Sequence, residues 1–355
     1  MTIIDPPIQK TSTVEAELTA ALDRIAIEAP ELAEARRRRG LIEAALLPEF
    51  PGAEVYLSGS VAHGDALTPL GDIDVGIIVP NPDGEYGPYK KGPTELKERA
   101  AKALQVLRAE FPNLRIIVEG QKRSILVRFG FPVAKGHDDF TADVIVAIDN
   151  PTGAGLYIPR HDHWDRSHPQ KHTEMIADAN RATSSAFKHG TRLMKHWARG
   201  NEDPIFSWHI KALALATISP PMSMTEYLQR FLDHAINELK LRDTPDPAGV
   251  SSPIKVNEKG GFTRTQVVAE LDKAKAHLVK ALEYDQEGYS VLAKNELADL
   301  FNDEAIMPRP DAAAVREAGA AYWRGRSPAL VTTAPAAIPS TSAYGKDTPR
   351  RAWAC

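Results

Sequence analysis

The pattern of hydrophobic and polar positions changes partway along the chain. In the first part, apolar residues at helical spacing over residues 13–47 and 94–111 are interleaved with short apolar runs that predict strands. These expected strands span residues 54–57, 72–79, 114–119, 124–131 and 140–148. From residue 172 onward the spacing is helical, with helices expected over residues 173–199, 207–217, 224–241, 266–284, 288–301 and 311–324. The pattern predicts an α+β lobe followed by a helical lobe.

This change of pattern also predicts how the chain is divided. We expect the α+β lobe, with a long N-terminal helix broken near Pro30, within residues 1–168, and the helical lobe within residues 169–326. Residues 327–355 consist mainly of Ala, Pro, Ser and Thr and offer little to bury, which is typical of a disordered tail.

The composition limits the classes of function. A formal net charge of −4 argues against a protein whose whole surface binds nucleic acid, so we do not expect a nucleic-acid partner to be required. No run of about 18 apolar residues and no N-terminal segment of signal-peptide type is present, so no membrane partner is expected and the chain is predicted to be cytoplasmic. The single cysteine, Cys355, excludes a disulfide within the chain and a cysteine-built zinc site.

Three aspartates border apolar strands and predict a metal site. Asp72 and Asp74 stand two positions apart at the start of one expected strand, so alternation directs both side chains to one face. Asp143 lies inside another such strand, and charges beside buried strands are costly without a cation. Carboxylates are the ligands of Mg²⁺, for which Mn²⁺ is a substitute, and two such ions would serve phosphoryl transfer. The plain alternative is that Asp72 caps a turn, Asp74 pairs with an arginine and Asp143 faces the surface.

A Gly-Ser pair upstream of these aspartates suggests a phosphate site. Gly59 would let the backbone approach a phosphate, and Ser60 offers its N–H and hydroxyl to the terminal phosphate oxygens. Each piece is weak alone, but the order of strand, Gly-Ser, Asp-x-Asp and a third strand aspartate is more specific. It predicts nucleotidyl transfer from a nucleoside triphosphate (NTP), with Asp72, Asp74 and Asp143 as catalytic residues.

Residues 59–65 (GSVAHGD) and 71–75 (GDIDV) resemble the signature of the cGAS/DncV-like nucleotidyltransferases, or CD-NTases. Residues 143–147 (DVIVA) are similar to the family's Asp-Val-x-Pro-Ala, with Val146 where proline is usual. Asp65 also departs from the family, which often has threonine there. A carboxylate at this position would repel a triphosphate unless it points away.

The resemblance continues into the second part and covers roughly residues 13–325. Residues 157–159, Trp164 and residues 168–169 resemble the loop that joins the two lobes. Residues 193–197 (LMKHW) resemble a helix whose lysine, Lys195 here, meets the triphosphate. Residues 206–211 (FSWHIK) resemble a segment in which a serine touches phosphate and the next aromatic residue stacks on a base. Those residues are Ser207 and Trp208, and the plain alternatives are a solvated lysine, a helix N-cap and a core tryptophan.

The resemblance implies a polymerase-β-like core with a mixed sheet and a helical C-terminal lobe. It further implies synthesis of a cyclic di- or trinucleotide from NTPs, ATP expected among them, with release of pyrophosphate, in anti-phage defence of the CBASS kind. Asp72 and Asp74 would bridge two Mg²⁺ ions, one of them shared with Asp143. Two alternatives stay open: a transferase with another acceptor (an RNA 3′ end, a small molecule or a protein), and a nucleotide-binding regulator without catalysis.

Three further signals are ambiguous. Histidines and aspartates over residues 161–172 lack paired ligand spacing, and a polar loop between the lobes is expected rather than zinc. The basic run at residues 36–39 is expected to be a solvated helical face rather than a nucleic-acid patch. By resemblance to operons that encode ubiquitin-transfer-like partners, such a partner could act on Cys355.

Overall fold

The structure is a computed structural model that describes residues 12–133 and 138–325. The strands are β1 (Glu54–Leu57), β2 (Asp72–Ile78), β3 (Arg115–Ile117), β4 (Ile125–Arg128), β5 (Thr141–Asp149), β6 (Leu156–Arg160) and β7 (His163–Ser167). The helices are α1 (Thr13–Arg24), α2 (Ala29–Leu46), α3 (Gly59–His63), α4 (Thr94–Ala103), α5 (Pro169–Ala182), α6 (Ala186–Gly200), α7 (Ser207–Thr217), α8 (Met224–Leu241), α9 (Arg264–Gln286), α10 (Ser290–Phe301) and α11 (Ala312–Trp323). Two 3₁₀ turns, η1 (Leu104–Ala109) and η2 (Glu258–Gly260), complete the order.

The strands form one mixed sheet in the order β1-β2-β5-β4-β3, and the β6–β7 hairpin continues from β5. β2 and β5 run parallel, whereas the other pairs are antiparallel. The predicted α+β class with a mixed sheet is therefore confirmed. Apolar side chains explain the central place of β2 and β5, because strands buried on both sides read as continuous hydrophobic runs.

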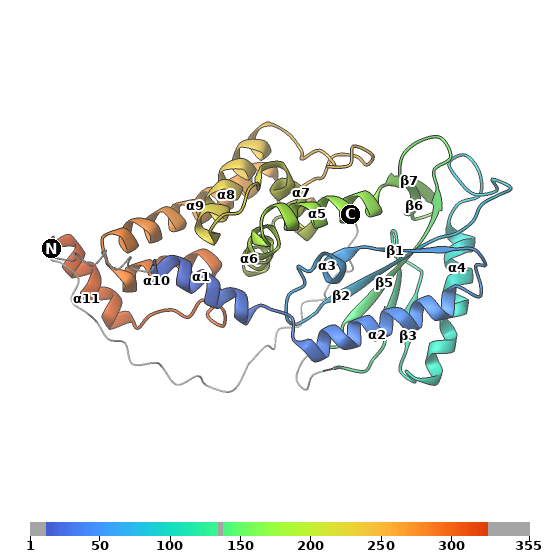
Figure 1. Cartoon of the computed structure of the whole chain (residues 1–355), viewed down its shortest axis with the longest axis horizontal. Helices are drawn as coiled ribbons and strands as arrows, with labels where there is room; N and C mark the ends of the chain where they lie inside the picture. Colours follow the sequence, from blue (N-terminus) through green and yellow to red (C-terminus); the bar gives the residue numbers. More distant parts are fainter. Residues whose placement is uncertain (1–11, 134–137, 326–355) are drawn as a thin grey trace, which may run out of the picture.

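The two faces of this sheet have different coverings. Ile73, Val75 and Ile77 of β2 belong to a core cluster with residues of α2, α4 and η1. The alternate residues Asp72, Asp74 and Gly76 lie on the opposite face because side chains alternate along a strand. In Figure 1, α5 and α6 lie on the side of the sheet away from α2. Alternation thus turns the acidic positions toward the helical half of the molecule.

The first helix packs with the C-terminal helices. Val14, Leu18, Ala21 and Ile25 are fully buried in the core cluster built by α6 to α10, and Figure 1 shows α1 among these helices. The expected broken helix over residues 13–47 is two separate helices, with Pro30 in the first turn of α2, where its missing N–H costs nothing. The division of the chain near residue 168 stays a prediction, but α1 packs with the residues beyond that point.

The segment expected as a loop between the lobes is a β-hairpin, so that interpretation was wrong. β6 and β7 pair antiparallel, and His161 sits at the turn with a positive φ of 56°. Trp164 anchors the hairpin by donating its indole N–H to the Lys91 carbonyl at 3.0 Å. The expected helix over residues 173–199 is likewise two helices, because Ser184 and Ser185 adopt left-handed backbone conformations between α5 and α6.

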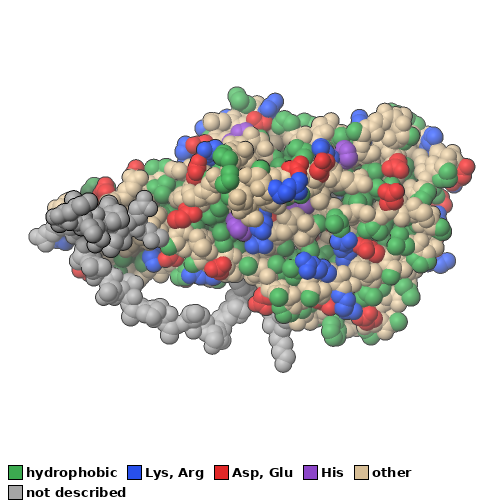
Figure 2. All heavy atoms as spheres, viewed as in Figure 1, with side chains coloured by type: hydrophobic (Ala, Val, Ile, Leu, Met, Phe, Trp, Pro, Cys, Tyr) green, Lys and Arg blue, Asp and Glu red, His purple; other side chains and the backbone are tan. Residues whose placement is uncertain are grey.

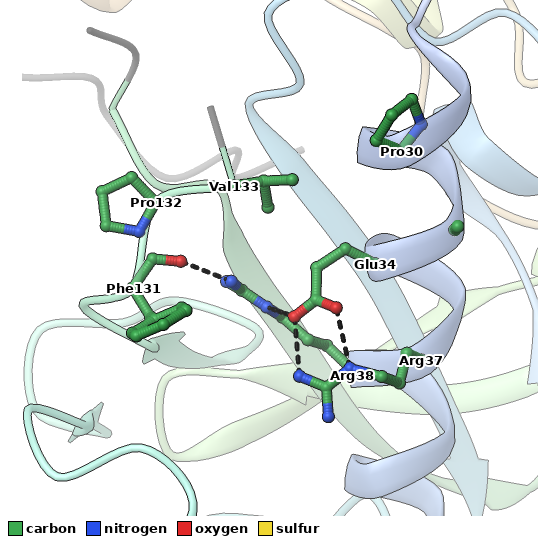
Figure 3. A pocket seen from close by; sticks show the side chains of 8 residues that line it. Pro30, Glu34, Arg37, Arg38, Phe131, Pro132 and Val133 are labelled. Atoms are coloured by element: carbon green, nitrogen blue, oxygen red, sulfur yellow. Dashed lines mark hydrogen bonds and ion pairs between the residues drawn. The ribbon is translucent and has the colours of Figure 1, made fainter. Parts of the chain in front are cut away.

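The basic run on α2 is only partly the solvated face that was expected. Arg38 is fully buried and lies 4.4 and 4.5 Å from the ring centroids of Phe140 and Phe129. Figure 3 shows its guanidinium between Glu34 and the backbone carbonyl of Phe131, to which it donates at 2.5 Å. Arg38 is therefore a core residue, since a charge so buried requires hydrogen-bonded partners on several sides.

Figure 2 shows acidic and basic side chains interspersed on the face in view. Within the described ranges, none of the helices combines the length and apolar character that a membrane crossing requires. The predicted disordered tail and Cys355 lie outside the described residues.

Candidate active site

Adjacent parallel strands bring the three predicted aspartates to one face of the sheet. Asp72 opens β2 and Asp74 follows two positions later. Asp74 is the direct register partner of Asp143 in β5. Asp143 is only 4% exposed, so the alternative of a surface-facing carboxylate does not hold. Among the described residues, no ion pair joins Asp74 to an arginine, which removes a second part of that alternative.

Burial and mutual repulsion disfavour the ionised forms of these carboxyl groups. Burial raises the pKa of Asp74 to about 8, and the charges of Asp72 and Asp143 add to this increase. Burial, with the charge of Asp72, raises the pKa of Asp143 to about 7. The pKa of Asp72 is raised by its burial as well. Three crowded carboxylates of this kind are the donor set that a hard divalent cation prefers, so these side chains fit Mg²⁺ or Mn²⁺.

A tighter acidic group lies elsewhere and does not compete as a metal site. In the described part of the chain, His277, Glu296 and Asp299 place ligand atoms within 4.8 Å of one another, closer than the three aspartates of the sheet. His277 is engaged with Glu296 at 2.7 Å, and Asp299 accepts from Arg309 at 2.6 Å. This group is therefore held together by a hydrogen bond between α9 and α10 and by the Arg309–Asp299 ion pair.

A buried serine orients one of the candidate metal ligands. The Ser124 hydroxyl donates to Asp143 Oδ1 at 2.9 Å, and Ser124 is 4% exposed. This bond works against the raised pKa of Asp143 because it favours the ionised carboxylate. Sequence reasoning missed Ser124, which stands just before β4 with no motif to distinguish it.

The predicted Gly-Ser turn contacts the aspartates directly. Gly59 has a φ of +80°, and a Cβ there would lie 1.7 Å from Asp74 Oδ2. Only glycine therefore fits between β1 and the carboxylate. Ser60 occupies the first turn of α3, and its carbonyl accepts from the Asp65 N–H at 3.0 Å. The turn holds Ser60 next to the acidic face of β2.

A tyrosine lies on the same face beyond these carboxylates. Tyr56 of β1 is 4% exposed, and its ring covers Gly76, where a Cβ would lie 2.0 Å from Tyr56 Cζ. Its hydroxyl is buried without a hydrogen-bond partner among the described residues. Burial and the charge of Asp74 raise the pKa of this phenol. Tyr56 was not foreseen because an aromatic residue in a short apolar strand is ordinary.

The Lys195 ammonium group is hydrogen-bonded within the protein. Its ammonium donates to the Asp65 carbonyl at 2.8 Å and to Asp65 Oδ1 at 3.1 Å. Lys211 of α7 lies 3.1 Å from Asp65 Oδ2. All three side chains are at most 5% exposed, which rules out the solvated-lysine alternative. Lys211, which sequence reasoning gave no role, is as central as Lys195.

These contacts explain how a carboxylate at position 65 is accommodated close to the Gly59–Ser60 turn. Burial alone would raise the pKa of Asp65, but the charges of Lys195 and Lys211 outweigh it and hold that pKa below its usual range. Asp65 is thus ionised and directed to the helical half. Burial lowers the pKa of Lys195 to about 8, although Asp65 opposes this shift.

His63 connects the lysines to the sheet by a short hydrogen-bond chain. Its Nδ1 lies 2.9 Å from Lys211 Nζ, and because lysine can only donate, Nδ1 is the acceptor. The proton of the neutral ring is then on Nε2, which donates to Thr173 Oγ1 at 3.1 Å. Thr173 donates in turn to the Leu57 carbonyl at 2.9 Å. Burial, followed by the charge of Lys211, lowers the pKa of His63 well below its usual value and keeps the ring neutral.

The other two predicted nucleotide-binding residues lie at the start of α7. Ser207 is its first residue and Phe206 its N-cap, without a capping side-chain hydrogen bond, so Ser207 is not the helix N-cap. Trp208 is partly buried against the helical core, and its ring lies 4.2 Å from that of His172 at 39°. His172 pairs with Asp246 at 2.7 Å and so ties the loop after α8 to α5.

The comparisons with known proteins agree with this geometry. Residues 41–127 match the family model described as a nucleotidyltransferase domain, a range that holds Gly59, Ser60, Asp72 and Asp74 and ends before Asp143. No curated protein matches the sequence. The chain therefore contains a nucleotidyltransferase domain.

Solved structures extend the likeness over both halves of the molecule. CdnC of E. coli MS115-1, solved with ATP, has 18% sequence identity and a TM-score of 0.60, covering 81% of this chain and 98% of its own. The CD-NTase CdnG of Bradyrhizobium diazoefficiens, solved with GTP, has 15% identity and a TM-score of 0.59, covering 86% and 98%. DncV of Vibrio cholerae, a cyclic AMP-GMP synthase, has 14% identity and a TM-score of 0.53, covering 85% and 90%. The chain has the fold of the cGAS/DncV-like nucleotidyltransferases, as the sequence resemblance implied.

Proposed function

We propose that this protein is a metal-dependent nucleotidyltransferase that makes a cyclic oligonucleotide from NTPs and releases pyrophosphate. One observation carries the proposal: Asp72, Asp74 and Asp143 share one face of the sheet, against the Gly59–Ser60 turn. Carboxylates beside a phosphate-binding turn are what phosphoryl transfer requires, because its demands are positioning and charge neutralisation.

Each half of the site has a distinct task in this proposal. Asp72, Asp74 and Asp143 would hold two Mg²⁺ ions, which supply a lowered pKa for the attacking hydroxyl and neutralise triphosphate charge. Ser60 would bind a phosphate oxygen through its N–H and hydroxyl. Lys195 and Ser207 would contact the triphosphate from the helical half, and Trp208 would stack on a base.

The structural neighbours favour cyclisation over another acceptor. The fold is shared with a cyclic AMP-GMP synthase and with proteins solved with ATP and GTP, and the likeness covers the helical half as well as the nucleotidyltransferase domain. We extend the proposal to a role in CBASS-type anti-phage signalling in the cytoplasm, which the same likeness supports. A transferase that uses an RNA, a small molecule or a protein as its acceptor would not need to bind a second nucleotide.

A product assay tests the proposal. The purified protein is incubated with each radiolabelled NTP and with all four, in Mg²⁺ or Mn²⁺, and the products are treated with phosphatase and then nuclease. We expect a phosphatase-resistant product that disappears when a required NTP is omitted. Label that is entirely phosphatase-sensitive, with no pyrophosphate released, would refute nucleotidyl transfer.

The variant Asp143→Asn is the matched catalytic control. It should still bind NTP, because the Gly59–Ser60 turn and the lysines are intact, but should lose turnover. Product formation near the wild-type rate would show that Asp143 has another role.

Conjugation at Cys355 is a separate proposal that rests on the family resemblance. Mass spectrometry after co-expression with a ubiquitin-transfer-like partner should show an adduct on the C-terminal peptide, and an unmodified peptide would count against it.

A further inference from the structure

Four side chains of the helical half hold the backbone of residues 57–65, the segment that carries Ser60. The acceptor carbonyls and their donors are Leu57 with Thr173 (2.9 Å), His63 with Asn180 (3.4 Å), Gly64 with Arg192 (2.8 Å) and Asp65 with Lys195 (2.8 Å). The phosphate-binding turn is therefore placed by α5 and α6 as well as by the sheet. In Figure 1, α3 lies at this junction between the sheet and α6.

Within residues 57–65, Asp65 is the only residue with a charged side chain. Its carboxylate is shared by Lys195 at 3.1 Å and Lys211 at 3.1 Å, and its side chain is 1% exposed. With His63 neutral, the group of Asp65, Lys195 and Lys211 keeps one net positive charge. Replacing buried ion pairs by apolar residues is often neutral or stabilising, so stability alone is a weak reason for this arrangement.

The hydrogen bonds of the two ammonium groups suggest a functional reason. Each lysine has three N–H donors. Lys195 directs two of them at the carbonyl and the Oδ1 of Asp65, and Lys211 directs two at His63 Nδ1 and Asp65 Oδ1. One N–H remains on each ammonium group, in an orientation fixed by the other two.

We propose that Asp65 is a positioning residue of the triphosphate site, which fixes the Lys195 ammonium beside the Gly59–Ser60 turn so that its third N–H is held for a phosphate oxygen. This inference rests on the proposed nucleotidyltransferase function. Asp65 contacts no reacting atom. It determines the affinity for the nucleotide, because a donor held in place loses less freedom when it binds.

The competing explanation is that Asp65 only balances the charge of two buried lysines. A double-mutant cycle with Lys211 separates the two, because Asp65→Asn with Lys211→Met keeps the wild-type net charge of the cluster. If Asp65 positions Lys195, adding Asp65→Asn to Lys211→Met still weakens nucleotide binding, by about tenfold or more for a lost charged hydrogen bond. If Asp65 only balances charge, the same step leaves binding unchanged or tightens it.

The measurement is the Kd of non-hydrolysable analogues of ATP, CTP, GTP and UTP with Mg²⁺, for wild type, Asp65→Asn, Lys211→Met and the double variant. The KM and kcat of product formation are measured beside it, and we expect the Asp65→Asn step to raise KM far more than it lowers kcat. Thermal unfolding and single-turnover amplitude give the folded, active fraction. If Asp65→Asn alone fails to fold, the comparison in the Lys211→Met background carries the test.

Two results are distinguishable in this design. If the wild-type protein neither binds an NTP nor forms product, the proposed function fails. If the wild type is active and the Asp65→Asn step leaves Kd and KM unchanged in the Lys211→Met background, the positioning role of Asp65 is overturned while the proposed function stands.

Discussion

In the proposed transferase, removing the hydroxyl of Ser124 should weaken the affinity for the divalent cation without removing any metal ligand. Ser124 Oγ donates to Asp143 Oδ1 at 2.9 Å in a buried setting. A hydrogen bond to a charged group contributes about 1.5–3 kcal/mol. Partners that orient a metal ligand typically change metal affinity or activity by about 10- to 100-fold. We therefore expect Ser124→Ala to raise the half-saturating Mg²⁺ concentration by about 10- to 100-fold.

The pH dependence of this defect gives a second signature. The Ser124 hydroxyl lowers the pKa of Asp143, which burial raises to about 7. Without the hydroxyl the pKa of Asp143 rises further, and protons compete more strongly with the cation. The defect should consequently be largest below pH 7 and should shrink as pH increases.

The assay is pyrophosphate release against Mg²⁺ concentration at several pH values, with Mn²⁺ binding measured separately by calorimetry. Ser124→Thr, which keeps a hydroxyl, should be much less affected. Ser223→Ala is the matched stability control, because Ser223 caps α8 far from the aspartates and its loss costs about 1 kcal/mol of stability. An unchanged Mg²⁺ requirement in Ser124→Ala, or an equal change in Ser223→Ala, would refute the reasoning.

Three further outcomes are expected. Gly59→Ala should abolish product formation, because the new Cβ would lie 1.7 Å from Asp74 Oδ2, whereas Gly40→Ala, with no atom within 4 Å, should stay active; an active Gly59→Ala would show that the turn can move. In metal-free protein, Asp74 has a folded pKa of about 8 against 3.8 unfolded, so the native state retains its proton and thermal stability should fall as pH rises from about 4 to 8. Mg²⁺ should restore more stability at pH 8 than at pH 5, and Asp74→Asn should reduce this difference, because only the raised pKa values of Asp143 and Asp72 then remain. Arg38→Met should cost about 3–5 kcal/mol in urea unfolding, because Asp139 and Glu34 lose their buried partner; a loss below about 1 kcal/mol would contradict its core role.

Local patterns were enough for the elements that carry the carboxylates. The runs at residues 54–57 and 72–79 are apolar and β-branched, and both are strands in the structure. Period-two alternation alone places Asp72 and Asp74 on one face, and their order with Gly59 and Ser60 singled them out together. These inferences rest on residues close in sequence, which is why they needed no tertiary information.

The remaining features depend on contacts between distant positions. The β6–β7 hairpin is rich in His, Asp and Arg, so its strands lack the apolar alternation on which the prediction relied. Arg38 reads as one of four solvated arginines until Phe129 and Phe140 enclose it. The role of Lys211 follows only from its contacts with Asp65 and His63, which belong to a separate part of the chain.

The charges on the two halves of the site suggest an order of binding. The sheet offers three carboxyl groups, and the facing cluster of Asp65, Lys195 and Lys211 offers one net positive charge. When the carboxyl groups ionise, the site is negative overall and repels a free triphosphate. Asp72, Asp74 and Asp143 would hold a divalent cation, which would displace the protons that burial retains on Asp74 and Asp143 and would offset this repulsion. Nucleotide affinity should therefore depend on the cation through Asp72, Asp74 and Asp143, and on orientation through Asp65. The sheet would govern when a nucleotide can enter, and the helical half would govern how it is held.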